Sequence, residues 1–260
     1  MHHPQAASRN EAAQAASDIL ARLRERSPRV HCITNTVAQN FTANALLAAG
    51  CIPSMTTSVE EIGSFVGGAQ ALLVNLGTFD GERRESTAIA VEAATLNRLP
   101  WVLDPVFVDR VPPRAAFARE LVARRPAVVR LNQSEFAALS DSAPSRDSAL
   151  SYARASRTVV AISGGTDLIT DGQRIAAVSN GHPLMSKVTA MGCAGSALVA
   201  ACLAVETDVF RAGASALAIM GVAGELAAEN SNGPGSFAVA IIDALHSLDG
   251  PALVSRARIS

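Results

Sequence analysis

The chain has 260 residues, which suits one large α/β domain, and 49% of them are hydrophobic, which allows a sizeable buried core. The formal net charge is −1 with no acidic or basic block, which argues against nucleic-acid or membrane-surface partners held by bulk electrostatics. No apolar run reaches the roughly 18 residues of a membrane-spanning helix. The best candidate, residues 194–205, is shorter and rich in small residues, and we interpret it as a buried helix.

Hydrophobic periodicity predicts helices that alternate with short, continuously apolar strands. The expected strands span residues 29–33, 51–55, 71–75, 101–103, 127–130 and 158–162. The expected helices span residues 10–26, 37–49, 59–66, 82–98, 114–124 and 132–139, with another ending at 156 and almost continuous helices from 194 to 248. Thr36 is a candidate N-cap. Residues 168–170 and 174–178 flank Asp171-Gly172, a strong hairpin signal.

This alternation indicates a mostly parallel sheet with helices on both faces, and the hairpin adds an antiparallel edge. We see no linker, so we predict a single domain over residues 1–260, with residues 1–10 flexible. In such sheets, ligands bind beyond the carboxyl ends of the strands. The residues expected at that edge are Asn35, Met55, Asp104, Asn132 and Ser163.

The four cysteines show no metal-site pattern. Cys32, Cys51, Cys193 and Cys202 include no pair with CxxC spacing, so a zinc site is not expected. We interpret Cys51 and Cys202 as small core hydrophobes. Free thiols are typical of a reducing compartment, so we expect a cytoplasmic protein.

The segment 178–201 carries the strongest candidate chemistry. A polar loop turns at Gly192 into a long apolar helix, and Cys193 lies at its start. The first amides of a helix have no intrahelical partner and the macrodipole adds about half a positive charge, so this turn can hold a phosphate or a developing anion. A thiol at such a position has a lowered pKa, so we expect some thiolate at Cys193 near neutrality. The alternatives are an ordinary turn at Gly192 and a buried cysteine that only shapes a pocket.

Six segments then occur in a specific order: HCITNTVAQNFTANALLAAGCIPSM, LLVNLGTF, VLDPV, NQSE, VVAISG, and SNGHPLMSKVT followed by MGC. Together they closely resemble the hydroxyethylthiazole kinase family of thiamine salvage, within the ribokinase-like group, over about residues 15–250. The resemblance implies a ribokinase-like three-layer sandwich. It also implies phosphorylation of 4-methyl-5-(2-hydroxyethyl)thiazole with ATP and Mg²⁺, and a homotrimer with active sites at the subunit contacts.

The resemblance also assigns the phosphate site. The chain lacks the GxxxxGK[ST] motif of P-loop enzymes, so phosphate binding falls to the turn at residues 190–193. Cys193 matches the position where related sugar and vitamin kinases carry an aspartate base. The family usually reads GTGC where this chain has Ala190 and Met191. Either the loop is held differently, or the turn keeps φ below zero.

Four residues are candidates for binding ATP. Arg114 aligns with the family's nucleotide-binding arginine, Ser163 stands where the family has threonine, and Gly164 permits a close turn. Asn132 begins the N-x-x-E motif. A solvated arginine on a helix face is the alternative interpretation of Arg114.

Glu135, at the end of that motif, and Asp104 are the candidate Mg²⁺ residues, because Mg²⁺ prefers oxygen ligands and keeps several waters. Glu135 can equally favour its own helix dipole, and Asp104-Pro105 can be a turn former.

The thiazole ring is small, flat and mostly apolar, so its pocket should be apolar with a few hydrogen-bond donors. Asn35 and Met55 match the family's ring-contacting positions, and Gly192, Val37 and His182 are further candidates. Core filling is the alternative for Met55, and a structural role is the alternative for His182.

Three other functions stay open. The chain could phosphorylate hydroxymethylpyrimidine or pyridoxal, or it could be a nucleotide-dependent dehydratase of the same fold. It could also bind nucleotide without turnover, because Ala190, Met191, Phe107 and Asp109 depart from the family pattern.

Overall fold

A computed structural model of the chain describes residues 9–260, and most of the segment predicted to be flexible lies outside these residues. All strands belong to one sheet in the order β2-β1-β3-β4-β5-β6-β7-β8. The strands are β1 (Arg29–Ile33), β2 (Ile52–Ser54), β3 (Ala71–Asn75), β4 (Trp101–Asp104), β5 (Val128–Asn132), β6 (Val159–Ser163), β7 (Asp167–Thr170) and β8 (Ile175–Val178). The pairs from β2 to β6 are parallel, and β7 and β8 add the antiparallel edge.

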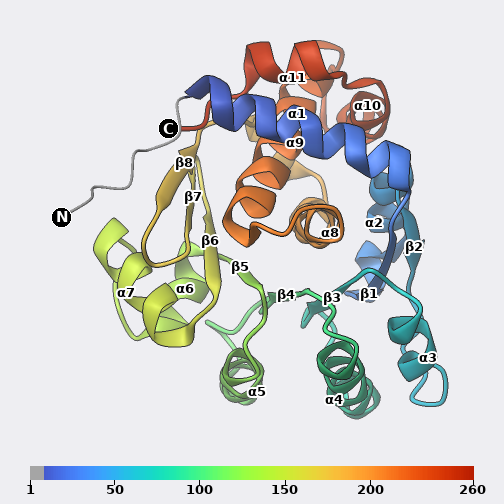
Figure 1. The fold of residues 1–260 in the computed structure, drawn as a ribbon, viewed down its shortest axis with the longest axis vertical. Helices are drawn as coiled ribbons and strands as arrows, with labels where there is room; N and C mark the ends of the chain where they lie inside the picture. Colours follow the sequence, from blue (N-terminus) through green and yellow to red (C-terminus); the bar gives the residue numbers. More distant parts are fainter. Residues whose placement is uncertain (1–8) are drawn as a thin grey trace.

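Helices cover both faces of the sheet, as predicted (Figure 1). One layer contains α1 (Arg9–Arg26), α2 (Gln39–Ala48), α8 (Met191–Leu203), α9 (Val209–Glu229), α10 (Pro234–Ser247) and α11 (Gly250–Arg256). The other contains α3 (Ile62–Gly67), α4 (Gly81–Leu96), α5 (Pro112–Ala123), α6 (Gln133–Ser140) and α7 (Arg146–Ser156). The short 3-10 turns η1 (Thr36–Ala38) and η2 (Pro183–Lys187) precede α2 and α8.

The continuous apolar character of the strands follows from this double coverage. Along β3, Leu73 packs into the core beneath α8, whereas Leu72 and Val74 pack into the core against α3 and α4. Successive side chains of a strand point to opposite faces, so both faces must be apolar when both are covered. The apolar composition of the strands therefore predicts the three-layer arrangement.

The hairpin at Asp171 forms as predicted. The Asp171 carboxylate accepts from the main-chain N–H groups of Gln173 and Arg174, at 2.8 and 2.7 Å. Gly172 has φ +89°, and a side chain there would also collide with Arg154. The β7–β8 turn is thus fixed by one carboxylate and one glycine.

Helix α9 is the central helix of its layer. By length and composition it could cross a bilayer, but 72% of its most apolar 18 residues are buried inside the protein. The Asp208 side chain caps its first turn. The burial is that of a core helix, and α9 packs against α1, α8 and α10.

The carboxyl ends of the parallel strands meet at one edge of the sheet, as predicted. Asn75 pairs in register with Asp104 at the ends of β3 and β4, and Asn132 pairs with Ser163 at the ends of β5 and β6. Helix α8 starts over the same edge and contacts β1, β3 and β4. Polar groups from distant parts of the sequence therefore converge below the first turn of α8.

Candidate active site

The first turn of α8 is open to a ligand. Met191, Gly192 and Cys193 are its first three residues, and the first main-chain bond at this end runs from Ala194 N–H to the Ala190 oxygen, at 2.9 Å. The amides of the three earlier residues have no intrahelical acceptor. The sharp bend lies at Ala190, with φ +72°, and not at Gly192. The expected turn at Gly192 and the alternative of a turn with φ below zero are both wrong.

Cys193 lies in a polar network at the end of the sheet. Its Sγ is 3.3 Å from Asn75 Nδ2, and the same nitrogen donates to Asp104 Oδ2 at 2.7 Å. The buried Thr34 hydroxyl lies beside the thiol and has no other hydrogen-bond partner among residues 9–260. The thiol is thus placed by strands β1, β3 and β4.

The expected thiolate is wrong. Burial raises the pKa of the Cys193 thiol to about 12, and the neighbouring Asp104 charge adds to the rise. Removing the thiol proton would place a second negative charge beside a buried carboxylate, which outweighs the attraction of the helix start. Cys193 is therefore a neutral thiol near pH 7.

Asp104 is the buried carboxylate at the centre of this network. Its Oδ2 also accepts from Ser196 Oγ, at 2.8 Å. Burial raises the pKa of Asp104 to about 6, Arg130 opposes the rise, and the charge of Glu135 adds to it. A buried carboxylate whose pKa is raised by a second carboxylate nearby is a fitting environment for a divalent cation.

Glu135 has a structural task that the sequence left as an alternative. One of its oxygens accepts from Asn132 N–H at 2.8 Å, and the Asn132 side chain accepts from Glu135 N–H at 2.9 Å, which makes a capping box for α6. The other oxygen accepts from Phe107 N–H at 3.0 Å. Each oxygen keeps acceptor capacity for a cation or water. No group of three His, Cys, Asp or Glu side chains within residues 9–260 has the arrangement of a metal site, so waters or phosphate oxygens would complete a Mg²⁺ shell.

A pocket of about 540 Å³ begins at the first turn of α8. Its walls include Ser163 and Gly164 from the end of β6, Gly192 from α8, and His182 from the loop after β8. The Ser163 hydroxyl donates to the Leu131 oxygen at 3.3 Å. The size and the open amides suit a nucleotide. Eight of the candidate residues do not line it: Asn35, Val37, Met55, Asp104, Arg114, Asn132, Glu135 and Cys193.

Arg130 is the positive side chain of this pocket, and the sequence reasoning missed it. Its Nη1 donates to the Gly192 oxygen at 2.9 Å and to Ser196 Oγ at 3.3 Å. Its charge also lowers the pKa of Asp167, opposing the rise caused by burial. An arginine next to Leu131 in an otherwise apolar strand was the available signal.

Arg114 does not line this pocket. Its Nη1 donates to the Val106 oxygen at 2.8 Å, and its guanidinium lies over the rings of Phe79 and Phe107. Burial lowers the pKa of Arg114. Its contacts fix the loop between β4 and α5, close to Glu135 but away from the pocket.

Asn35, Val37 and Met55 follow the carboxyl ends of the neighbouring strands β1 and β2, whereas the pocket lies at the ends of β5 and β6. Asn35 caps η1 by accepting from Val37 N–H at 3.1 Å, so the cap is Asn35 and not Thr36. A Cβ on Gly77 would lie 2.6 Å from Asn35 Nδ2 and 2.9 Å from Asn75 Oδ1. Asn35 and Asn75 therefore approach one another across Gly77, which joins the Asn35 side to the Cys193 network. Val37 is 70% exposed despite being apolar.

His31 fixes the segment that carries Met55. Its Nδ1 lies 2.8 Å from Ser54 Oγ, and its Nε2 lies 3.0 Å from the Thr56 oxygen. Burial lowers the pKa of His31 to about 4, so the ring is neutral at pH 7. Met55 is half-buried, packs against the core, and lies between the two residues that His31 holds.

His182 has a structural contact of its own. Its Nδ1 accepts from Leu184 N–H at 3.2 Å, and its ring stacks on Phe237. It lines the pocket with Ser163 and Gly192, and not the side formed by Asn35 and Met55. A larger cavity of about 690 Å³ lies elsewhere, beside α1 and α9, and none of the candidate residues lines it.

Comparison with known proteins identifies the family of this chain. The model of the "HK: Hydroxyethylthiazole kinase family" matches residues 20–250. A probable hydroxyethylthiazole kinase from Agrobacterium fabrum is 47% identical over 248 residues, which cover 95% of each chain. The structure of a hydroxyethylthiazole kinase protein from Pyrococcus horikoshii OT3 superposes with a TM-score of 0.90 at 36% identity, over 94% of this chain and 98% of that one.

A ribokinase-like superfamily protein from Enterococcus faecalis superposes with a TM-score of 0.69 at 13% identity, covering 90% of this chain and 95% of that one. That similarity concerns the fold alone, and it confirms the expected ribokinase-like sandwich. The matches over nearly the whole length settle the family. The chain belongs to the hydroxyethylthiazole kinase family.

Proposed function

We propose that this protein transfers the γ-phosphoryl group of ATP to the hydroxyl of 4-methyl-5-(2-hydroxyethyl)thiazole. The observation that supports this most directly is the convergence of the open α8 amides, Arg130 and Asp104 at one end of the sheet. Phosphoryl transfer depends chiefly on alignment and on neutralising phosphate charge. The site supplies both.

In this proposal ATP lies in the 540 Å³ pocket, with Ser163 and Gly164 along its wall and its phosphates directed to the first turn of α8. The amides of Met191, Gly192 and Cys193 donate to phosphate oxygens. Arg130 supplies positive charge and keeps the helix start in place through the Gly192 oxygen. Arg114 and Asn132 act through the loop and the cap that they stabilise.

Asp104 and Glu135 would hold Mg²⁺, which neutralises phosphate charge when bound. The thiazole alcohol lies against Asn35, Val37 and Met55, with its hydroxyl near Cys193. A neutral thiol is a poor proton acceptor, so Cys193 shapes and orients the site.

We also propose a homotrimer in the cytoplasm, with active sites at the subunit contacts. The exposure of apolar Val37 beside Asn35 supports a neighbouring copy at that side. Light scattering after size-exclusion chromatography tests the oligomeric state. A monomer that retains full activity would overturn this part of the proposal.

A coupled ADP-release assay tests the activity against its alternatives. We expect ADP with the thiazole alcohol and at least about a hundredfold lower kcat/KM with hydroxymethylpyrimidine or pyridoxal. Tight ATP binding without ADP release would favour the nucleotide-binding alternative. The changes at Ala190 and Met191 leave the helix start open, which argues for turnover.

A pair of substitutions at one position tests the anion site. Gly192→Asp adds a carboxylate among the open amides and should abolish turnover in a folded protein. Gly192→Ala is the matched control, because a Cβ there meets only Arg130 Nη1, at 3.8 Å. Full activity of Gly192→Asp would show that the phosphate does not bind there.

A further inference from the structure

The loop after β8 forms one wall of the pocket assigned to ATP. Six of its residues line that pocket: Asn180, Gly181, His182, Pro183, Met185 and Ser186. The loop leads directly into Ala190 and the open turn of α8. Contacts that hold this loop in place therefore affect both the width of the pocket and the position of the turn that leads to the phosphate site.

Helix α9 provides a flat seat for the loop. A Cβ on Gly221 would lie 2.6 Å from Asn180 Cβ and 2.8 Å from its main-chain carbon. A Cβ on Gly224 would lie 2.6 Å from Met185 Sδ. The two glycines lie on one face of α9, so the loop packs against the helix without a side chain between them.

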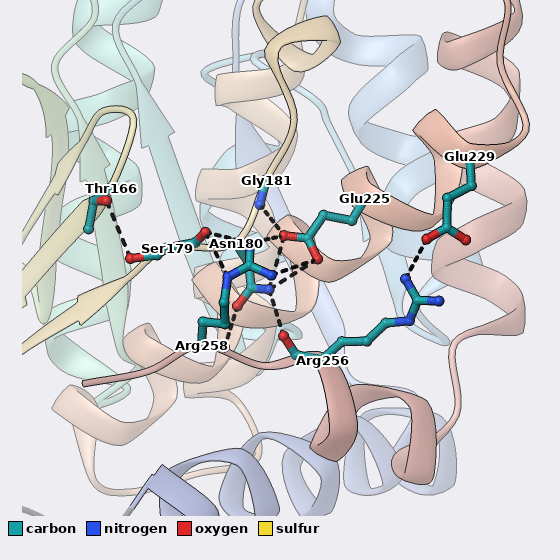
Figure 2. A network of polar contacts seen from close by, with 8 residues as sticks. All are labelled: Thr166, Ser179, Asn180, Gly181, Glu225, Glu229, Arg256 and Arg258. Atoms are coloured by element: carbon teal, nitrogen blue, oxygen red, sulfur yellow. Dashed lines mark hydrogen bonds and ion pairs between the residues drawn. The ribbon is translucent and has the colours of Figure 1, made fainter.

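Glu225, the next residue of α9, binds the loop through its carboxylate (Figure 2). Its Oε1 accepts from Gly181 N–H at 2.9 Å, and Asn180 Nδ2 lies 3.1 and 3.3 Å from its two oxygens. Gly181 has φ +129°, a conformation that only glycine adopts readily, so this part of the loop depends on its partners for a fixed shape.

The C-terminal segment completes the network on the other side of the loop (Figure 2). Arg258 pairs with Glu225 Oε1 and donates to the Ser179 oxygen at 2.7 Å. The Arg258 N–H donates to Asn180 Oδ1 at 2.6 Å, and Asn180 Nδ2 donates to the Arg256 oxygen at 2.9 Å. Glu225 and Asn180 thus join α9, the loop and the C-terminal segment.

We propose that Glu225 is a positioning residue for ATP binding, which holds the Asn180–Gly181 part of the loop as the nucleotide-facing wall. This inference rests on the proposed binding of ATP in that pocket. The carboxylate faces three donors, the Gly181 N–H, the Asn180 amide and the Arg258 guanidinium. A neutral amide would present an N–H₂ group to one of them, and that donor would lose its acceptor on residue 225.

The test is the Glu225→Gln variant, assayed with ATP and the thiazole alcohol varied in turn. We expect the KM for ATP to rise about fivefold or more, with kcat and the KM for the alcohol within about twofold of the wild type. A general loss of stability would not separate the two substrates in this way. Arg258→Gln should produce a smaller change of the same kind.

Glu229→Gln is the matched control. It lies one turn further along α9 and removes another carboxylate–guanidinium pair, between Glu229 and Arg256 at 2.6 Å, without a contact to the loop. We expect wild-type kinetics from it. Equal effects of Glu225→Gln and Glu229→Gln would overturn the inference.

ATP titration calorimetry on the folded variants gives a second readout that needs no turnover. Unchanged ATP affinity in both Glu225→Gln and Arg258→Gln would overturn the inference while the kinase proposal stands. A wild type that binds ATP but releases no ADP with the alcohol would overturn the kinase proposal, and the calorimetry would still report on the loop.

Discussion

Asn75 Nδ2 lies 2.7 Å from Asp104 Oδ2, in register across the ends of β3 and β4. The same nitrogen lies 3.3 Å from the Cys193 thiol. One buried amide group thus links the Asp104 carboxylate, which is proposed to hold Mg²⁺, to the thiol at the start of α8.

We expect Asp104→Asn to stabilise the fold at pH 8. Burial raises the pKa of Asp104 from 3.8 to about 6, so the folded state binds this proton more tightly than the unfolded state, and the contribution of Asp104 to stability falls as the pH rises between those values. The variant should gain up to about 3 kcal/mol at pH 8, and the gain should vanish below pH 4. Urea denaturation at both pH values measures it, and a loss of stability at pH 8 would contradict the expectation.

We expect His31→Gln to reduce acid denaturation. Burial lowers the pKa of His31 from 6.5 to about 4, so the unfolded state binds this proton more tightly, and stability falls as the pH drops through that window. His31 and Asp104 therefore act with opposite signs over similar pH values. Between pH 6.5 and 4, the free energy of unfolding should fall by up to about 3 kcal/mol less in the variant than in the wild type. Equal slopes in the two proteins would argue against a neutral buried imidazole.

We expect the Cys193 thiol to react slowly with iodoacetamide at pH 8, because its pKa is raised to about 12. The rate should increase with pH beyond 9, as measured by peptide mass spectrometry against a free cysteine peptide. For the same reason, Cys193→Ser should lower kcat by only about tenfold or less. Fast alkylation at pH 7, or a loss of about a thousandfold in kcat, would instead support the hypothesis that Cys193 acts as a thiolate base.

We expect Arg130→Gln to raise the KM for ATP by about tenfold or more, because it removes positive charge from the pocket. Arg114→Gln is the matched comparison. It should leave the KM within about twofold and lower the free energy of unfolding by about 1 kcal/mol, through the lost bond to the Val106 oxygen. A larger rise in the KM for ATP in Arg114→Gln than in Arg130→Gln would support nucleotide binding by Arg114.

The sheet was predictable from the sequence because its physical signal is local. Strand 71–75 is apolar at its first four positions, which occurs when both faces are covered, and the Asp171-Gly172 turn marks the antiparallel edge. The gathering of Asp104, Asn132 and Ser163 at one edge follows from parallel topology alone. The first residue of α8 could not be predicted from the sequence, since Ala190 takes a left-handed conformation more typical of glycine.

The ionisation of the site could not be predicted, because it depends on burial by distant segments. The helix start favours a thiolate at Cys193, but Asp104 and the surrounding strands reverse the balance. The two arginines illustrate the same limit. Arg114 lies in the first turn of a helix with Phe79 and Phe107 within reach, and only the folded chain shows that these contacts hold it away from the pocket occupied by Arg130.

Ala190 has a consequence for how this sequence can be improved. An alanine in the left-handed region holds backbone energy of roughly 1–2 kcal/mol that a glycine would not. Position 190 is therefore a place where one replacement could make the folded chain more robust to heat. The same replacement would make the backbone at position 190 more flexible, directly before the amides that are proposed to bind the phosphate.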